Sequence, residues 1–359
     1  MATTATPLTK LAYQTVQQGK SYFGLAHKAI STQLMNVISP PPEAETETQS
    51  ISPRLLLQIN ERMNQLLEED WVDAERGVYS TDILFDNPWE DFFRYYPMIW
   101  VDQPQVWNRV SGKRFEEFSP GISTEDYPKY YARNFHYQTD GYLSDQSANL
   151  YDLQVEILFN GTADAMRRRI LAPLKQLMAE SGFENASRTR ILDVACGTGR
   201  TLRFLRDVFS KASLYGVDLS PAYLRKANQM LSSIPGELPQ LMQANAEALP
   251  YVDNFFQGAT SVFMFHELPA PVRQNVINEA YRVVQPGGTF IICDSIQLSD
   301  SPELKVSMEN FSVMFHEPFY RNYIEDDLNG RLAQAGFEVV DTRIHFMSKY
   351  WIARKPAEG

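Results

Sequence analysis

Residues 190–200 read Arg-Ile-Leu-Asp-Val-Ala-Cys-Gly-Thr-Gly-Arg, and this stretch decides the fold of the chain. Its apolar first half has the composition of a buried strand, and Gly197 and Gly199 turn that strand directly into a helix-like run. Glycine at such a turn lets the backbone approach a ligand with no Cβ in the way. Ligands of open α/β sheets bind at the carboxyl ends of the strands, so this turn is a candidate nucleotide-binding loop.

Strand-like and helix-like runs alternate after this loop. The expected strands are 190–195, 213–219, 241–246, 258–266 and 289–296. The expected helices are 201–209, 221–231, 271–284 and 324–336. Two last strands, 337–347 and 349–355, have almost no connection and must therefore be antiparallel. The pattern predicts an α/β, Rossmann-like sheet of seven strands, mostly parallel with an antiparallel last strand.

Asp218 ends the second expected strand, 19 residues after Gly199. An acid at about this distance from the glycine turn can accept hydrogen bonds from ribose hydroxyls. A nicotinamide-dependent oxidoreductase is therefore an alternative. Its G-x-G-x-x-G fingerprint needs a third glycine for close helix–strand packing, and Leu202 stands at that place here.

Five motifs follow one another in a characteristic order: LDVACGTGR, GVDLS, NAEALPY, FHEL and RVVQPGGTFIICD. Together they resemble the class I S-adenosylmethionine (SAM)-dependent methyltransferases. More narrowly, they resemble the type 11 branch, which contains the ubiquinone and menaquinone C-methyltransferases. The resemblance covers about residues 188–298, and the antiparallel end of the chain agrees with the family's seven-stranded sheet.

The resemblance implies that SAM is the cofactor and that eight residues hold it. The methionine end would be held by Asp193 and by the backbone around Ala195, Gly197 and Gly199. The nucleoside end would be held by Asp218 at the ribose and by Leu219, Asn245 and Ala246 at the adenine. Asn245 stands where the family usually has Asp, and its amide oxygen can still accept a hydrogen bond from the adenine amino group.

His266 follows the strand expected over 258–266, where its side chain should face the cleft. An imidazole there can serve as a general base near neutral pH, and a purely structural histidine is the alternative. Glu267 beside it is expected to make a loop contact. His136, Tyr151 and His316 lie in segments that often cover the acceptor, so they are candidate substrate contacts. The sequence predicts no metal site.

The region before the core divides into three segments. Residues 1–38 form an amphipathic helix with apolar helical spacing over 8–38, three lysines and no acid. This helix either packs on the rest of the protein or makes peripheral contact with an anionic membrane. Residues 39–52 form a proline-rich linker. Residues 53–160 form an aromatic-rich, mainly helical accessory or lid region, in which prolines 88, 97, 104, 120 and 128 predict short elements. The methyltransferase domain is expected over 161–359.

Composition narrows the class of partner. The net charge of −11 argues against a nucleic-acid partner, and two isolated cysteines fit a reducing, cytoplasmic setting. The expected acceptor is a hydrophobic or aromatic small molecule that is quinone-, lipid- or secondary-metabolite-like. A catalytically inactive methyltransferase-fold scaffold or binding protein remains an alternative. The sequence does not predict the oligomeric state.

Overall fold

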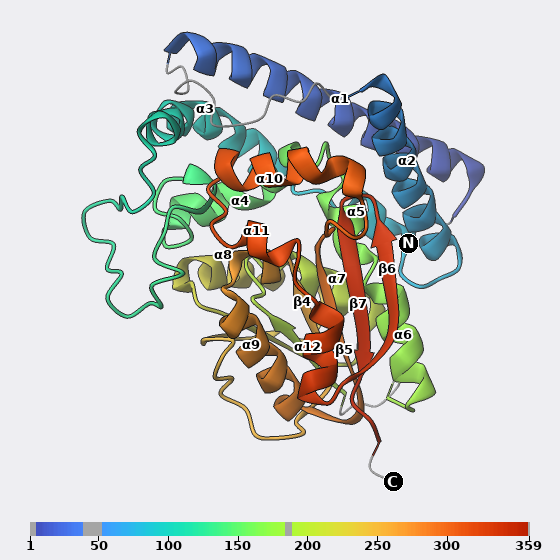
Figure 1. The fold of residues 1–359 in the computed structure, drawn as a ribbon. Helices are drawn as coiled ribbons and strands as arrows, with labels where there is room; N and C mark the ends of the chain where they lie inside the picture. The colour runs from blue at the N-terminus through green and yellow to red at the C-terminus, as the bar shows by residue number, and fades with distance from the viewer. Residues whose placement is uncertain (1–4, 39–51, 184–188, 358–359) are drawn as a thin grey trace.

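The computed structural model describes residues 5–38, 52–183 and 189–357 (Figure 1). Its centre is a seven-stranded sheet with the strand order β3-β2-β1-β4-β5-β7-β6. The strands are β1 (Arg190–Val194), β2 (Ser213–Asp218), β3 (Gln240–Gln243), β4 (Phe256–Val262), β5 (Val284–Ser295), β6 (Glu338–His345) and β7 (Ser348–Arg354). Strands β1 to β5 pair in parallel, and β7 lies antiparallel between β5 and β6. The predicted Rossmann-like sheet is confirmed.

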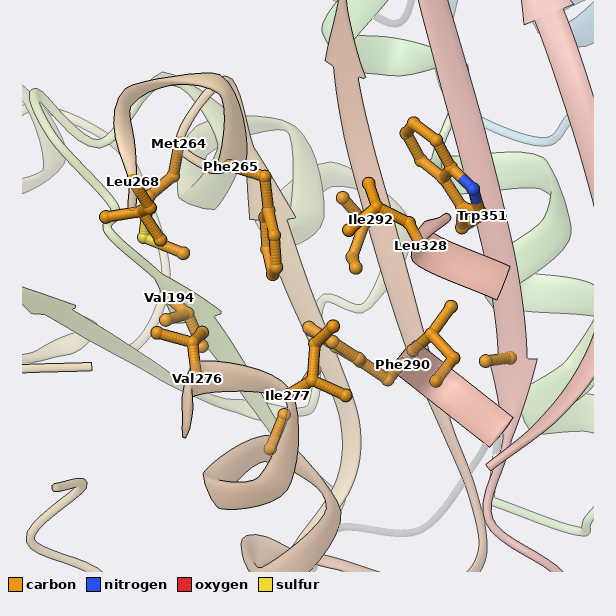
Figure 2. Packing of buried hydrophobic residues seen from close by; sticks show 14 of the residues in the cluster. Val194, Met264, Phe265, Leu268, Val276, Ile277, Phe290, Ile292, Leu328 and Trp351 are labelled. Atoms are coloured by element: carbon orange, nitrogen blue, oxygen red, sulfur yellow. The ribbon is translucent and has the colours of Figure 1, made fainter. Parts of the chain in front are cut away.

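Helices cover both faces of this sheet because successive strand residues point to opposite sides. Ile291 packs with the helices of one face, α6 (Leu171–Glu180), α7 (Arg200–Val208) and α8 (Pro221–Ser232). Ile292 packs with those of the other face, α9 (Ala270–Val283) and α12 (Leu328–Ala335). Figure 2 shows this second layer, where Val276 of α9 lies beside Val194 of β1 and Ile277 of α9 lies beside Phe290 of β5.

The remaining helices gather beyond the sheet, at the end where the parallel strands terminate (Figure 1). They are α1 (Pro7–Ile38), α2 (Pro53–Glu75), α3 (Trp89–Gly112), α4 (Asp145–Leu158), α5 (Ala163–Arg168), α10 (Lys305–Met314) and α11 (Tyr320–Tyr323). The start of α2 follows the sequence, since Pro53 is its first residue and the Ser52 hydroxyl accepts from the Leu55 N–H. The predicted linker lies at 39–52, and residues 39–51 of it are outside the described residues.

Two local predictions in this region are wrong. Pro97 and Pro104 do not divide their segment into short elements but lie inside the 24-residue helix α3. Burial of Ile99 and Trp107 anchors this helix and outweighs the local cost of its prolines. The sequence also predicts a helix that Thr162 caps and that continues to about Glu180. Instead the Thr162 hydroxyl donates to the Phe159 carbonyl, and the helix breaks between α5 and α6.

Helix α1 lies across the end of the molecule opposite the C terminus and contacts α3 and α4 (Figure 1). Its lysines turn toward the body: Lys10 pairs with Glu68, Lys20 with Glu156, and Lys28 donates to a carbonyl of α4. The three lysines therefore do not form a separate basic face.

The solvent side of α1 instead carries exposed apolar residues, namely Leu8, Leu11, Tyr22, Leu25 and Val37. Membrane contact by this helix stays a prediction, now supported by its apolar outer face alone. Within the described ranges, no helix combines the length and the apolar character needed to cross a bilayer.

The Asp70 cluster joins the helices to the core. Asp70 of α2 is fully buried and accepts two hydrogen bonds from Arg168 of α5, at 2.9 and 2.6 Å. The hydroxyls of Tyr13 (2.6 Å) and Tyr79 (2.7 Å) also donate to it. One carboxylate therefore ties α1, α2, α5 and the segment after α2 together, and its charge is compensated by a buried guanidinium.

We expect Asp70→Asn to lower the free energy of unfolding by about 3–5 kcal/mol, because it leaves the Arg168 guanidinium buried without a counter-charge. Tyr13→Phe removes one hydrogen bond to the same carboxylate and should cost about 1 kcal/mol. Urea denaturation followed by circular dichroism measures both. The control is Glu68→Gln, which removes a partly exposed ion pair worth about 1 kcal/mol at most. Equal effects of Asp70→Asn and Glu68→Gln would contradict a structural role for the cluster.

Candidate functional site

A cleft opens where β1, β2 and β4 end. Its floor comes from the sheet and the loops after it, and includes Ala195, Gly197, Asp218, Leu219, Asn245 and Ala246. Its cover is aromatic and includes Tyr130, Tyr131, Phe135, Tyr142, Tyr151 and Tyr223. Most of this cover comes from the region before β1, so the accessory helices and loops complete the site.

The two glycines of the loop after β1 serve different purposes. Both have left-handed backbone, with φ of 52° at Gly197 and 85° at Gly199. A Cβ on Gly197 would meet only Tyr223, at 3.9 Å, which leaves room for a ligand. A Cβ on Gly199 would lie 3.1 Å from both Ala227 and Leu231 of α8. Gly197 therefore opens the cleft, whereas Gly199 lets α7 pack closely on α8.

Asp218 is held in place by the loop that it faces. The Gly197 N–H donates to its Oδ2 (2.9 Å), and the Ser220 N–H donates to its Oδ1 (2.8 Å). Burial raises the pKa of Asp218 to about 6, although these N–H groups oppose the shift. The carboxylate is thus oriented toward the cleft before any ligand binds, as ribose recognition requires.

Asp193 lies below the loop and does not line the cleft. Its Oδ1 accepts from the Thr260 hydroxyl (2.8 Å), whereas its buried Oδ2 has no hydrogen-bond partner among the described residues. Burial raises the pKa of Asp193 to about 7. Of the eight predicted cofactor residues, the structure places all except Asp193 and Gly199 on the cleft wall.

Leu202 bears on the nicotinamide alternative. It is fully buried against β2, where a Cβ on Gly216 would approach its Cδ1 to 2.8 Å. In the dinucleotide fingerprint, a glycine on the helix allows the helix and the strand to pack closely. Here Gly216 on strand β2 allows this close packing instead. The loop therefore departs from the dinucleotide pattern in structure as well as in sequence.

His266 does not reach the wall of the cleft, and its neighbour Glu267 does. The His266 Nδ1 lies 2.7 Å from the Asp294 Oδ1. Burial alone lowers the pKa of His266, but the Asp294 carboxylate outweighs it and raises that pKa to about 9. His266 therefore lies behind Glu267 and not on the cleft wall where it was expected, and its catalytic role stays a prediction. The short 3-10 turn Phe265–Glu267 turns the histidine toward β5.

Three side chains from distant segments, those of His136, Glu267 and Glu317, form a carboxylate–histidine cluster. The His136 Nε2 lies 3.0 Å from the Glu317 Oε1 and 3.8 Å from the Glu267 Oε1, and the Tyr142 hydroxyl donates to Glu267. Burial lowers the pKa of His136, but the two carboxylates outweigh it and raise that pKa to about 10. Glu317 was not a candidate, and its only signal in the sequence is its place beside His316.

The other two candidate substrate contacts have different outcomes. Tyr151 lines the cleft and packs edge-on against Tyr142 and Tyr223, with centroid distances of 6.0 and 5.5 Å. His316 instead stacks on Phe115 at 4.1 Å and does not line the cleft. The prediction of a substrate contact at His316 is therefore not supported by its position.

Residues 191–288 match the family described as a methyltransferase domain. The chain contains a class I SAM-dependent methyltransferase domain. The segment that matches the family begins at β1 and ends within β5, so it includes Asp193, the glycine loop, Asp218 and Asn245.

Relatives of this methyltransferase domain include a demethylmenaquinone methyltransferase of Symbiobacterium thermophilum. It is 31% identical over 155 residues, which are 43% of this chain and 57% of that protein. An uncharacterized methyltransferase of Synechocystis is 29% identical over 178 residues, or 48% of this chain and 75% of its own length. The chain thus spans little more than half the length of the first of these relatives.

Among solved structures, a SAM-dependent methyltransferase from Methanosarcina mazei aligns with a TM-score of 0.39 at 20% identity. The alignment covers 49% of this chain and 96% of that one. The family assignment rests on the sequence match and on the geometry above.

We expect SAM affinity to fall as the pH drops through about 6, because protonation of Asp218 removes the charged acceptor of the ribose hydroxyls. At pH 5 about one molecule in ten keeps this carboxylate ionised, so affinity should be about tenfold lower than at pH 8. Asp218→Asn should weaken binding at pH 8 by about 1.5–3 kcal/mol and reduce the pH effect near 6. Isothermal titration calorimetry measures both, and Glu303→Gln, which alters a partly exposed carboxylate outside the cleft, is the control that keeps the Asp218 step. Unchanged affinity in Asp218→Asn would contradict the assignment.

Proposed function

We propose that this protein transfers a methyl group from SAM to a hydrophobic or aromatic small molecule of quinone-, lipid- or secondary-metabolite-like character. The observation that carries the proposal is the aromatic cover of the cleft, formed by Tyr131, Phe135, Tyr142, Tyr151 and Tyr223. Small-molecule sites are mostly apolar with few polar anchors, and Glu267 is such an anchor here. The demethylmenaquinone methyltransferase relative supports the same class of acceptor.

The reaction is an in-line displacement at the methyl carbon. An electron pair of the acceptor forms the new bond, the carbon–sulfur bond breaks, and its electrons remain on sulfur to give S-adenosylhomocysteine. The proton that the acceptor carried leaves to a base or to solvent. Positioning supplies much of the rate, since holding two reactants in line removes most of the entropic cost of their encounter.

The residues of the chain would divide this work. Asp218 holds the ribose, the Gly197 loop holds the methionine end, and the Tyr142, Tyr151 and Tyr223 rings exclude water from the sulfonium. The Glu267 carboxylate faces the acceptor and is fixed by the Tyr142 hydroxyl. His266 lies behind it, with its Nε2 3.8 Å from the Glu267 Oε1. We therefore assign His266 as a positioning residue, in place of the base expected from the sequence.

An inactive scaffold is the second candidate function. The strained backbone of Ala195 (φ 58°), a residue of the cleft wall, favours an active site over it. Strained backbone costs folding free energy, and it persists mostly at sites where a ligand or a reaction depends on it. The net charge of −11 supports an acceptor other than nucleic acid.

We expect labelled methyl groups from SAM to enter the small-molecule fraction when the protein is incubated with cell extracts. A mostly apolar cleft whose two acids are Asp218, at the ribose, and Glu267 selects small hydrophobic acceptors, so mass spectrometry should find metabolites that gain the label. Label found in RNA or protein but not in small molecules would contradict the proposed acceptor class. SAM binding without any transfer would support the scaffold alternative.

Glu267→Gln should lower kcat by about 100-fold or more while SAM affinity stays within about threefold, because the carboxylate faces the acceptor. Steady-state kinetics with the acceptor identified above and calorimetry with SAM measure the two effects. Glu303→Gln is the matched control, since that carboxylate is a partly exposed partner of Arg62 outside the cleft. A parallel loss of SAM affinity would place Glu267 with the cofactor instead.

A further inference from the structure

Within the part of the chain that the structure describes, Glu317 is a buried carboxylate with one partner, the His136 imidazole. Its side chain is fully buried, and apart from the contact with His136 neither oxygen has a hydrogen-bond partner among the described residues. Asp294 is equally buried, yet its oxygens accept from the N–H groups of Phe265 and Ser295 and contact His266. Because an unsatisfied buried carboxylate is costly, Glu317 points to a ligand that supplies the missing contacts.

The spacing of the carboxylate–histidine cluster suits a metal ion. The His136 Nε2 and one oxygen each of Glu267 and Glu317 all lie within 4.8 Å of one another. Metal–ligand bonds of about 2.1 Å place neighbouring ligand atoms of an octahedron about 3.0 Å apart and opposite ones about 4.2 Å apart. The 3.0 and 3.8 Å separations from His136 fall between these values.

The backbone that carries these ligands is strained. His136 has a φ of 54°, Tyr137 has 53°, and His316, immediately before Glu317, has 49°. Non-glycine residues rarely adopt left-handed backbone, and they persist in it where the surrounding structure holds them, often at functional sites. The Arg109 guanidinium holds this loop by donating to the Tyr137 carbonyl (2.8 Å). This left-handed backbone places the His136 side chain beside the two carboxylates.

We propose that His136, Glu267 and Glu317 bind one divalent transition-metal ion at the acceptor end of the cleft. One imidazole nitrogen with two carboxylate oxygens is a donor set for Zn²⁺ or Mn²⁺, whereas Mg²⁺ and Ca²⁺ prefer oxygen alone. The ion would supply the contacts that Glu317 lacks and would neutralise the two adjacent carboxylates.

Such an ion would also define the acceptor more closely, a step that rests on the proposed function. Three protein ligands leave coordination positions open, and Glu267 lines the cleft, so an open position would face the acceptor. The metal would then bind an oxygen of the acceptor and hold it as a Lewis acid beside the methyl group. The acceptor class narrows to apolar molecules that carry an oxygen donor.

Equilibrium dialysis of the chelator-treated full chain against Zn²⁺ or Mn²⁺, followed by metal analysis, tests the site. The expected result is one ion per chain, with affinity at least about tenfold weaker in Glu317→Gln and in His136→Gln. The matched controls are Glu303→Gln and His345→Gln, whose side chains pair with Arg62 and Glu69 outside the cluster. Both controls should bind like the unaltered chain, and the melting temperature of the unaltered chain should rise progressively with the concentration of metal.

Absence of a stoichiometric ion at millimolar metal, or equal affinity in the Glu317→Gln and control variants, would overturn the proposal. In that case, the cluster would consist of a protonated His136 between two carboxylates, with no metal ion. If Glu317→Gln does not fold, His136→Gln and the visible absorption of Co²⁺ bound to the unaltered chain decide the question. Calorimetry with SAM on metal-free protein separates the two failures. SAM binding without metal binding overturns this inference alone, whereas loss of SAM binding overturns the proposed function.

Discussion

The reversal of strand order at β1 is the constraint on which the rest of the structure depends. With β2 on one side of β1 and β4 on the other, the connections after these strands diverge and leave a crevice at their carboxyl ends. The Gly197 N–H and the Asp218 carboxylate meet across this crevice, so backbone from β1 orients the acid that ends β2. A sheet that ends in an open crevice needs a cover before it can hold an apolar reactant away from water.

Residues 130–151 supply most of that cover, and buried charges fix the helical region to the core. Arg168 pairs with Asp70, while Arg200, the residue after Gly199, lies 2.5 Å from Asp164 of α5 and donates to the Asp86 carbonyl. The cofactor loop and the helical region are thus joined by direct contacts at the first turn of α7. Breaking a buried pair leaves an uncompensated charge, so the orientation of the cover is specified strongly.

Residues from three distant segments form the acceptor end of the site. Glu267 follows β4, Glu317 precedes α11, and His136 belongs to the loop before α4. None of the three stands out in its own segment of sequence. The fold brings the His136 Nε2 within 3.0 Å of the Glu317 Oε1 and within 3.8 Å of the Glu267 Oε1, and this proximity gives the cluster its chemistry. The aromatic rings around them lower the local polarity, which makes each uncompensated charge more costly and each bound ligand more favourable.

The sequence by itself determined the sheet, the glycine loop and Asp218, because these depend on spacing within one strand–turn–helix unit. The start of α2 is likewise set locally, since Ser52 caps the helix and Pro53 is its first residue. Only the tertiary structure decided that the lysines of α1 face inward, since helical periodicity shows that a face exists but not which partner covers it. Likewise, the orientation of the short turn Phe265–Glu267 decides whether His266 or Glu267 reaches the cleft. The two residues are adjacent in the chain, so the sequence alone does not distinguish them. Glu317 could not be predicted, because a buried carboxylate is defined by what surrounds it and not by its neighbours in the chain.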